Sequence, residues 1–291
     1  MKHKVSIPIG NACNSNCLFC MAREQRKYAP PSFQEVVSAV FASRVKGREV
    51  ELFGGEFLLR RDALSIILSC RRAGFTSISF GTNGRMLANP DFAKAVVKAG
   101  ADNINFSLHG FRSETHDAIT RRPGSHALLL KGIRNVINAG AKHVRIIFVI
   151  TKLNYREMPA VAGMFKNRKE VDNIAFNFVR PMEYFSPEEY RAIVPRMTDI
   201  VPFLQEAAVF PKTQFRYIPP CIFDKKGRRA THAAREMYDS PKDKHSNMFN
   251  YLKENMAHGK PCGKCSKIQL CPGGWKTYLA IYGDAELRPF H

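Results

Sequence analysis

Three cysteines near the start of the chain have a spacing that could hold a reactive metal cluster. Cys13, Cys17 and Cys20 form a C-x3-C-x2-C triplet directly after the short apolar segment 5–9. Three thiolates this close together can bind three corners of an iron–sulfur cube and leave the fourth iron without a protein ligand. Because an open coordination position is where a metal does chemistry, the triplet predicts a catalytic cluster rather than a structural one.

Other uses of the triplet stay open on these residues alone. A zinc site usually combines a C-x2-4-C pair with a second pair or two histidines, and no fourth ligand follows near residue 20. A disulfide framework is disfavoured, because residues 1–20 contain Lys2 and Lys4 but lack the continuous apolar core of a secretory signal. Zinc and incidental cysteines are therefore the alternatives to an iron–sulfur cluster.

The composition is that of a globular protein with a basic surface. The 291 residues are 45% hydrophobic and 24% charged, which suits one large domain with an appendage. Eight cysteines without an export signal, and no apolar run near the roughly 20 residues of a membrane span, indicate a cytoplasmic protein without membrane partners. The formal net charge of +20 fits a solvated basic surface, or attraction of an acidic peptide, a phosphate-bearing substrate or RNA.

Short apolar segments alternate with helical patterns along the first 208 residues. We expect strands at residues 5–9, 49–53, 77–80, 103–108, 143–150 and 173–179. Helices are expected between them at residues 33–44, 62–72, 90–99, 127–139 and 155–165, with a last helical pattern at 187–208. This alternation predicts an α/β protein whose parallel strands form a partial (β/α)6 TIM-like barrel over residues 1–208.

The C-terminal part has a different character. Residues 209–291 contain a possible strand at 212–218 and a polar stretch at 225–244 that reads as a long loop. A region this small rarely builds a sufficient core, and such regions usually depend on metal. We therefore expect a small metal-dependent extension after the barrel.

Four motifs follow successive expected strands. The cysteine triplet follows the first strand, a Gly-Gly-Glu motif at 54–56 the second, and Gly-Thr-Asn-Gly at 81–84 the third, while Ser107 ends the fourth. In a parallel barrel the carboxyl ends of the strands meet at one rim, where function collects. The four motifs are therefore expected to form one site.

This combination resembles the radical S-adenosylmethionine (SAM) superfamily. The resemblance rests on the cysteine triplet with Phe19 before its last cysteine and on the Gly-Gly-Glu motif, and it covers about residues 3–180. It implies a [4Fe-4S] cluster on the triplet, whose free iron is chelated by the amino and carboxylate groups of SAM. It further implies an enzyme that cleaves SAM to a 5′-deoxyadenosyl radical, with electrons from a donor such as a flavodoxin or ferredoxin.

Several residues are expected to contact the cofactor. Gly54 and Gly55 would let the backbone approach the methionine part of SAM, and Glu56 can accept a hydrogen bond from its ammonium group. Arg145 interrupts the apolar run 144–150 and, if buried, needs a partner such as a carboxylate; otherwise it lies at the solvated start of a strand. The expected cofactor residues are Phe19, Gly54, Gly55, Glu56, Thr82, Asn83, Ser107 and Arg145.

Three further residues are expected to face a substrate. His109 stands in Ser-Leu-His-Gly, at a position where the superfamily often has aspartate. Arg121 belongs to the stretch 116–125, which resembles a segment of peptide-modifying members, although an exposed helix end also suits it. Asn177 lies between two phenylalanines of the last expected barrel strand.

A second group of cysteines has the spacing C-x40-C-x2-C-x5-C. Its members are Cys221, Cys262, Cys265 and Cys271. Four thiolates can close a structural zinc site. The sequence from 262 onward instead resembles the auxiliary-cluster region of the SPASM and Twitch groups, which implies a second [4Fe-4S] cluster. The full SPASM pattern would place another cysteine where Trp275 stands, so a single auxiliary cluster is expected. The remaining Cys70 is expected to be a small core residue.

Taken together, these patterns predict an oxygen-sensitive radical SAM enzyme. The leading substrate hypothesis is a ribosomally synthesised peptide, because the auxiliary region and residues 116–125 resemble peptide maturases. Radical SAM modification of a nucleotide, nucleoside or RNA is the alternative that the charge favours. A non-catalytic, zinc-containing nucleic-acid-binding protein would explain the cysteines and the charge, but it does not account for the Gly-Gly-Glu motif or the βα alternation.

Overall fold

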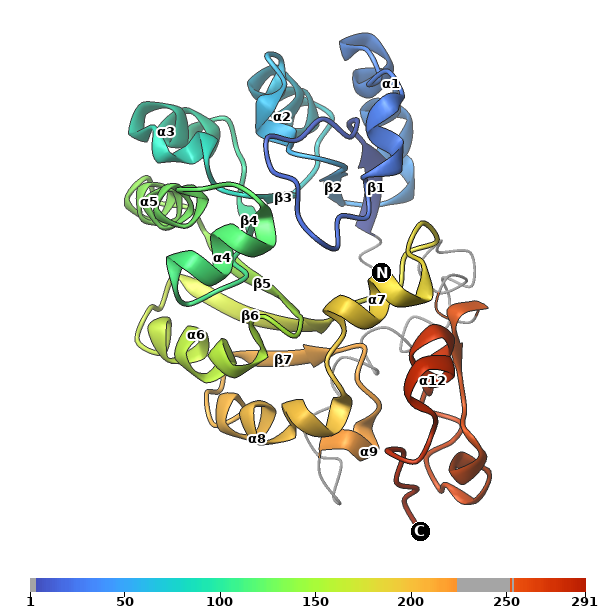
Figure 1. Cartoon of the computed structure of the whole chain (residues 1–291). Helices are drawn as coiled ribbons and strands as arrows, with labels where there is room; N and C mark the ends of the chain where they lie inside the picture. Colours follow the sequence, from blue (N-terminus) through green and yellow to red (C-terminus); the bar gives the residue numbers. More distant parts are fainter. Residues whose placement is uncertain (1–3, 224–251, 253) are drawn as a thin grey trace. The chain divides into compact units, whose positions relative to one another are not determined.

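Seven strands alternate with helices in the computed structural model, which describes residues 4–223, 252 and 254–291 (Figure 1). These strands are β1 Lys4–Pro8, β2 Glu49–Phe53, β3 Ser77–Thr82, β4 Asn103–Ser107, β5 His143–Ile150, β6 Val171–Phe178 and β7 Thr213–Arg216. Each strand from β1 to β4 pairs in parallel with the next one along the chain, and β6 pairs in parallel with β7. The predicted α/β class with parallel strands is confirmed.

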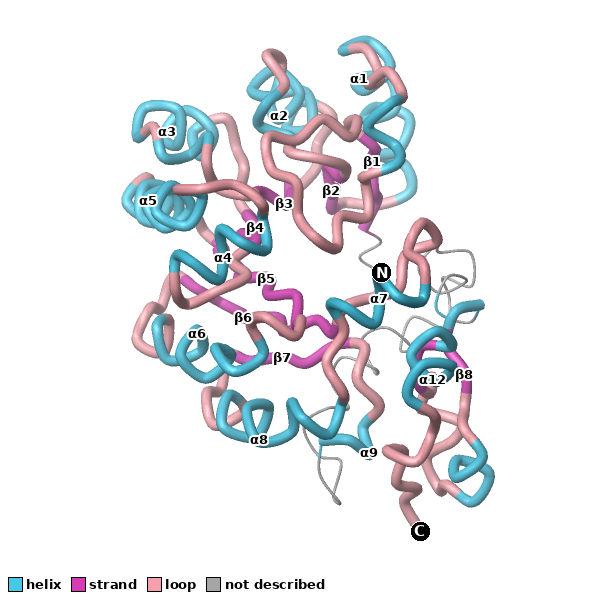
Figure 2. Tube along the Cα trace, in the orientation of Figure 1, coloured by secondary structure: helices cyan, strands magenta, loops and turns pink. Residues whose placement is uncertain are grey.

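The helices follow the predicted positions with two differences (Figure 2). They are α1 Phe33–Ser43, α2 Ala63–Arg72, α3 Pro90–Lys98, α4 Ser113–Thr120, α5 Ser125–Asn138, α6 Met158–Met164, α7 Pro187–Ile193, α8 Met197–Ala207, α9 Pro220–Phe223 and α12 Lys276–Tyr282. The continuous helix predicted over 187–208 is wrong, because Val194 is extended before Pro195 and separates α7 from α8. Helices α4, α9 and α12 were not predicted.

The described residues form two compact units. Unit 1 comprises the described residues within 1–147 and 167–173, and unit 2 those within 148–166 and 174–291. This division by contacts differs from the boundary expected after residue 208, which stays a prediction. The polar stretch expected as a loop at 225–244 lies outside the described residues.

In unit 1 the strands bury one face and expose the other in part. Helices α1, α2, α3 and α5 lie on one side of the strands (Figure 1). Apolar side chains that alternate along β2, β3 and β4, such as Leu52 and Phe106, are at most 1% exposed. The register places Glu51, Ser79 and Asn103 side by side on the opposite face. We call this opposite side, which also carries Asn105, Ser107 and Arg145, the polar face.

Two further observations concern the remaining expectations for unit 1 and for membrane contact. Cys70 on α2 is completely buried, which confirms that it is a core residue. In the part of the chain that the structure describes, every helix is too short or too polar to cross a bilayer.

In unit 2 the C-terminal segment packs through aromatic residues and a buried carboxylate. Strand β8 Met256–Ala257 pairs antiparallel with β9 Gly274–Trp275, and α12 follows directly. Trp275 is fully buried, with its ring 5.6 Å from that of Tyr217. The Tyr278 hydroxyl accepts from the Met197 N–H (2.7 Å) and donates to Glu286. The start of α8 is thereby tied to the C-terminal segment.

Replacing Glu286 by glutamine should lower the free energy of unfolding by about 1–3 kcal/mol. The Thr198 hydroxyl (2.5 Å) and backbone N–H (3.2 Å) and the Tyr278 hydroxyl all donate to this carboxylate. An amide nitrogen would oppose at least one of these donors. Thermal unfolding measures the effect, and the exposed Glu206 on α8, replaced in the same way, should leave the melting temperature unchanged.

The stability difference between the wild type and Glu286→Gln should depend on pH. Burial acts to raise the pKa of Glu286, but hydrogen bonds from Thr198 and Tyr278 outweigh it and hold this pKa below its ordinary value. A carboxyl whose pKa is lower in the folded state stabilises the fold above its unfolded pKa and loses that contribution as pH falls through its folded pKa. The difference should be full at neutral pH and shrink below about pH 4.3. A constant difference down to pH 3 would contradict this assignment.

Candidate cluster and cofactor sites

The three N-terminal cysteines lie on a loop between β1 and α1, which we call the cysteine loop (residues 10–31). Its backbone is bound along the Gly-Gly-Glu motif, where the N–H of Gly55 donates to Gly10 (2.9 Å) and that of Glu56 to Ala12 (2.7 Å). On the other side, the N–H groups of Asn16 and Leu18 donate to carbonyls at the end of α4 (2.9 and 3.0 Å). All three cysteines are half-buried. The loop is therefore held by backbone contacts before any metal binds.

One arginine joins the two ends of the cysteine loop. The Nη1 of Arg60 donates to the carbonyl of Ile9 (3.1 Å), before the loop, and to that of Pro31 (2.8 Å), at its end. Asp62 orients the same guanidinium through two hydrogen bonds of 2.8 and 2.7 Å. This role was not predicted, since it depends on contacts across 51 and 29 positions of sequence.

The two glycines of the Gly-Gly-Glu motif are required by the cysteine loop itself. A Cβ on Gly54 would lie 2.1 Å from the carbonyl oxygen of Gly10, and one on Gly55 would lie 2.2 Å from that of Ala12. Both distances are far below a van der Waals contact, and the neighbours are backbone atoms. The glycines thus let two backbones approach each other. Their expected contact with SAM stays a prediction.

Glu56 links the second motif to the third. Its side chain is only 3% exposed and accepts from the Thr82 hydroxyl (2.8 Å), the Asn83 N–H (2.6 Å) and the Leu58 N–H (3.3 Å). Burial raises the pKa of Glu56, and these hydrogen bonds oppose that rise. The carboxylate therefore organises the loops around the cysteines, and a bond from the SAM ammonium would be additional to this network.

The cysteine sulfurs lie among hydrogen-bond donors. The Ser15 N–H (3.4 Å) and the Asn83 amide (3.8 Å) donate to Sγ of Cys13, and Nη2 of Arg26 donates to Sγ of Cys20 (3.2 Å). Burial raises the pKa of the Cys17 thiol to about 12, so only metal ligation would make it a thiolate at neutral pH. N–H donors to thiolate sulfur are a normal feature of protein iron–sulfur clusters. This donor set fits a cluster on the three cysteines.

Phe19 packs against a column of buried histidines. The ring of His109 meets that of Phe19 edge to face at 4.9 Å, and the rings of His116 and His126 follow at 6.0 and 5.4 Å. Nδ1 of His116 accepts from the backbone N–H of His109 (3.0 Å). Burial, with the neighbouring His116 second, holds the pKa of His109 well below its ordinary value, so the imidazole is neutral. His109 is 2% exposed and supports the cysteine loop; its substrate contact stays a prediction.

The remaining predicted residues lie at different places. Ser107 ends β4 and is half-buried on the polar face, where Arg145 is the register partner of Asn105. Nε of Arg145 is buried without a hydrogen-bond partner among the described residues, which is consistent with a ligand there. Arg121 is exposed and ends α4 with φ 52°. Asn177 belongs to unit 2, on β6, and its buried Oδ1 also has no partner within the described part of the chain.

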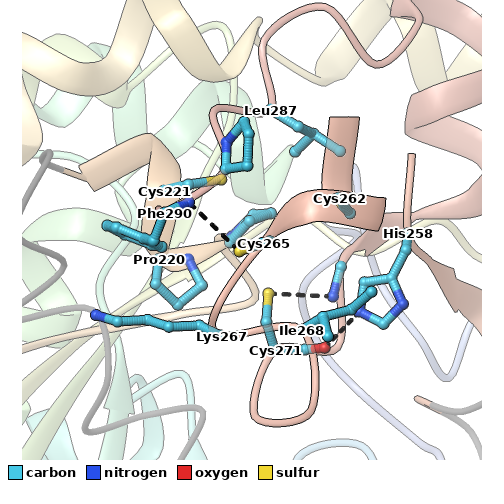
Figure 3. A pocket seen from close by; sticks show the side chains of 13 residues that line it. Pro220, Cys221, His258, Cys262, Cys265, Lys267, Ile268, Cys271, Leu287 and Phe290 are labelled. Carbon is cyan, nitrogen blue, oxygen red and sulfur yellow. Dashed lines mark hydrogen bonds between the residues drawn. The ribbon is translucent and has the colours of Figure 1, made fainter. Parts of the chain in front are cut away.

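The second group of cysteines surrounds one pocket in unit 2 (Figure 3). Cys221 comes from α9 and meets Cys262, Cys265 and Cys271 of the C-terminal segment there. The N–H of Phe290 donates to Sγ of Cys265 (3.4 Å). The N–H of Gly273 donates likewise to Sγ of Cys271 (3.4 Å). Proline, leucine and phenylalanine side chains form much of the wall. This mixture of thiols, apolar walls and N–H···S contacts fits an iron–sulfur cluster. Among the residues described, no three His, Cys, Asp or Glu side chains are arranged to hold one metal ion.

A family assignment follows from the sequence around the first site. Residues 7–165, which include the cysteine loop, the Gly-Gly-Glu motif and Ser107, match the model of the Radical SAM superfamily. The chain belongs to this superfamily. Membership implies a [4Fe-4S] cluster and SAM, and the prediction of a radical SAM enzyme is confirmed.

Similar proteins of known sequence match about half of the chain. A protein of Metallosphaera sedula named "Probable GTP 3′,8-cyclase" is 36% identical over 159 residues, which are 53% of this chain and 49% of that protein. A protein of Thermoplasma volcanium with the same name is 35% identical over 160 residues, or 53% and 47%. The chain thus spans about half the length of the relatives it matches.

Solved structures resemble the whole chain in fold. Streptococcus suis SuiB bound to the precursor peptide SuiA has a TM-score of 0.64 at 12% identity, covering 100% of this chain and 75% of that one. Native anSMEcpe with bound AdoMet has a TM-score of 0.58 at 15% identity, covering 99% and 92%. At these identities the likeness shows the fold alone. Together with the parallel strands, it confirms the predicted α/β fold with a partial TIM-like barrel.

Proposed function

We propose that the radical SAM enzyme holds its [4Fe-4S] cluster on Cys13, Cys17 and Cys20. The observation that carries this proposal is the hydrogen-bonded convergence of three loops, which follow β1, β2 and β3, around Cys13. When bound, the cluster would supply the electron for cleavage of SAM to a 5′-deoxyadenosyl radical, which takes a hydrogen atom from the substrate. Three ligands leave one iron for the amino and carboxylate groups of SAM.

The residues of unit 1 would bind and orient SAM beside that iron. The Gly54 and Gly55 backbone, the carboxylate of Glu56 and the hydroxyl of Ser107 are proposed to receive its polar groups. The buried Nε of Arg145 has unused hydrogen-bonding capacity among the described residues and suits a carboxylate. Because the ring of Phe19 meets that of His109 edge to face, the part of the cysteine loop between Cys17 and Cys20 is held against a buried side chain.

The proposed substrate is a ribosomally synthesised peptide. Full-length similarity in fold to a structure that contains a precursor peptide supports a peptide. The polar face supports it as well, because half-buried Glu49 and Glu51 of β2 share that face with Arg145, and Lys4 pairs with Glu51 (3.1 Å), so charges of both signs lie there. A triphosphate would meet carboxylates there, whereas a peptide offers amides and charges of both signs.

A nucleotide is the second candidate, and a specific observation favours it. The sequence relatives over the first half of the chain carry the name "Probable GTP 3′,8-cyclase". The net charge of +20 and the half-buried Arg145, whose Nε has no hydrogen-bond partner among the described residues, are compatible with a phosphate-bearing substrate. RNA is the less favoured member of this class.

The four cysteines of unit 2 are proposed to hold an auxiliary [4Fe-4S] cluster. With all four thiolates bound, no iron would be open to a substrate, so electron transfer or structural support is the proposed role. Position 275 holds a tryptophan, which is fully buried, and therefore supplies no further cysteine ligand. A soluble one-electron donor of the flavodoxin or ferredoxin class is proposed as the reducing partner.

Anaerobic reconstitution tests these proposals together. About eight irons and eight sulfides per chain, brown absorbance and release of 5′-deoxyadenosine from SAM are expected. Stoichiometric zinc without cleavage would overturn the enzyme assignment. Adding a peptide pool or GTP to separate reactions then distinguishes the two candidate substrates. Only the true substrate should stimulate release of 5′-deoxyadenosine, and a deuterium label should change at the carbon from which hydrogen is abstracted. Stimulation by GTP alone would replace the peptide proposal.

Replacing Arg145 by methionine should raise the Kd for SAM about 10- to 100-fold, the loss expected for a charged hydrogen bond. Methionine keeps the length of the side chain but not its charge. Equilibrium binding of SAM to the reconstituted protein measures the change. The exposed Arg134 on α5 offers a matched Arg→Met control, which should bind SAM as the wild type does. An unchanged Kd for SAM together with a raised KM for the substrate would show that Arg145 contacts the substrate and not SAM.

A further inference from the structure

Arg26 is a cation directed at one of the cluster cysteines. It belongs to the 3-10 turn Glu24–Lys27 and reaches back six residues, so that its Nη2 lies 3.2 Å from Sγ of Cys20. Its Nε is buried and has no hydrogen-bond partner among the described residues. Unlike Arg60, which is paired with Asp62, Arg26 forms no ion pair with a carboxylate in the described part of the chain.

The guanidinium of Arg26 therefore has a cysteine sulfur, and no carboxylate, as its neighbour in the described part of the chain. A guanidinium stays charged at every accessible pH, and leaving it partly buried without an anion costs free energy. Three cluster thiolates would supply the missing negative charge.

We propose that Arg26 raises the reduction potential of the cluster that Cys13, Cys17 and Cys20 hold, an inference that rests on the proposed function of these cysteines. Reduction by one electron from the external donor adds a negative charge to the cluster and breaks no bond. A charge-assisted N–H···S bond strengthens when the sulfur becomes more negative, so it stabilises the reduced cluster more than the oxidised one. Arg26 is thus a positioning residue that makes the cluster easier to reduce.

A redox titration of the reconstituted full chain tests this role. The variants are Arg26→Leu and Arg26→Gln. The control is Lys27→Leu, which removes one positive charge from the next residue along the chain. Lys27 is exposed, and its ammonium lies 5.5 Å from the centre of the Tyr28 ring. Electron paramagnetic resonance follows the reduced cluster, and the signal that SAM alters identifies the one at the cysteine loop. At a fixed potential, Arg26→Leu should lower the ratio of reduced to oxidised cluster about tenfold, a midpoint about 59 mV more negative. Arg26→Gln should give a smaller shift, and Lys27→Leu none.

Each other outcome has a definite reading. Midpoints of both Arg26 variants equal to that of Lys27→Leu overturn the proposal. A weakened Kd for SAM with an unchanged midpoint also overturns it, because Arg26 then contacts the cofactor and not the cluster sulfur. If Arg26→Leu fails to retain iron, the midpoint of Arg26→Gln decides. Absence of any cluster at the cysteine loop in the wild type is a different failure, that of the proposed ligand set.

Discussion

Replacing Gly55 by alanine should prevent cluster assembly on the cysteine loop and lower SAM cleavage more than about 100-fold, beyond the usual effect of a change outside the ligand set. The new methyl group would lie 2.2 Å from the carbonyl oxygen of Ala12 and 2.6 Å from the backbone of Asn11. Neither neighbour is a flexible side chain that could turn away. The loop would have to move outward and break the bond from Glu56 N–H to Ala12, one residue before Cys13.

Iron analysis and circular dichroism separate this local effect from unfolding. Iron should fall from about eight to about four per chain, because the auxiliary cysteines belong to unit 2. Gly163→Ala on α6 is the matched control, since a Cβ there meets only the ring of Phe210, at 3.6 Å. This control should keep both clusters. Full iron and normal cleavage in Gly55→Ala would show that the loop can shift without loss of the site.

Replacing Cys17 by alanine should abolish SAM cleavage, again by more than about 100-fold, because two thiolates cannot hold the cube with one iron open. Burial raises the pKa of this thiol to about 12, so metal ligation is what would make it a thiolate at neutral pH. The measurement is release of 5′-deoxyadenosine, with iron and sulfide determined on the same sample.

Cys70 provides the control for this experiment within the same unit. Its side chain is completely buried on α2, where it is a core residue and not one of the proposed cluster ligands. Cys70→Ala should cost modest stability through a small cavity and keep iron and SAM cleavage at wild-type levels. Retention of all iron in Cys17→Ala would contradict the ligand set proposed for the triplet.

Much of the architecture was predictable because the strands of unit 1 separate two environments. Short apolar segments bounded by polar ones marked the strands, and residues such as Leu52 of β2 and Ile146 of β5 are fully buried in them. Helix α4 has only eight residues and few apolar ones, so its period was too weak to recognise. The separation of α7 and α8 depends on the conformation that Pro195 imposes on Val194.

The cluster ligands of the candidate site could be predicted from the sequence, but the residues that hold the cysteine loop in place could not. Cysteines and the Gly-Gly-Glu motif carry local signals, because their residue types and spacings are restricted by the chemistry. Arg60 and Arg26 carry none, since a surface arginine and one that binds a loop carbonyl or a thiol look alike in sequence. Glu56 shows the same limit, because its three hydrogen bonds come from residues brought together only by folding.

The contact of a single guanidinium with both ends of the cysteine loop has a consequence for how the metal enters. Arg60 closes residues 10–31 into a ring, so the three thiols are gathered during folding and not at the moment of binding. The conformational entropy of ordering them is then lost from the folding equilibrium rather than from the affinity for the cluster. Preorganisation of this kind would favour binding of a cluster by the three thiols without any additional contact.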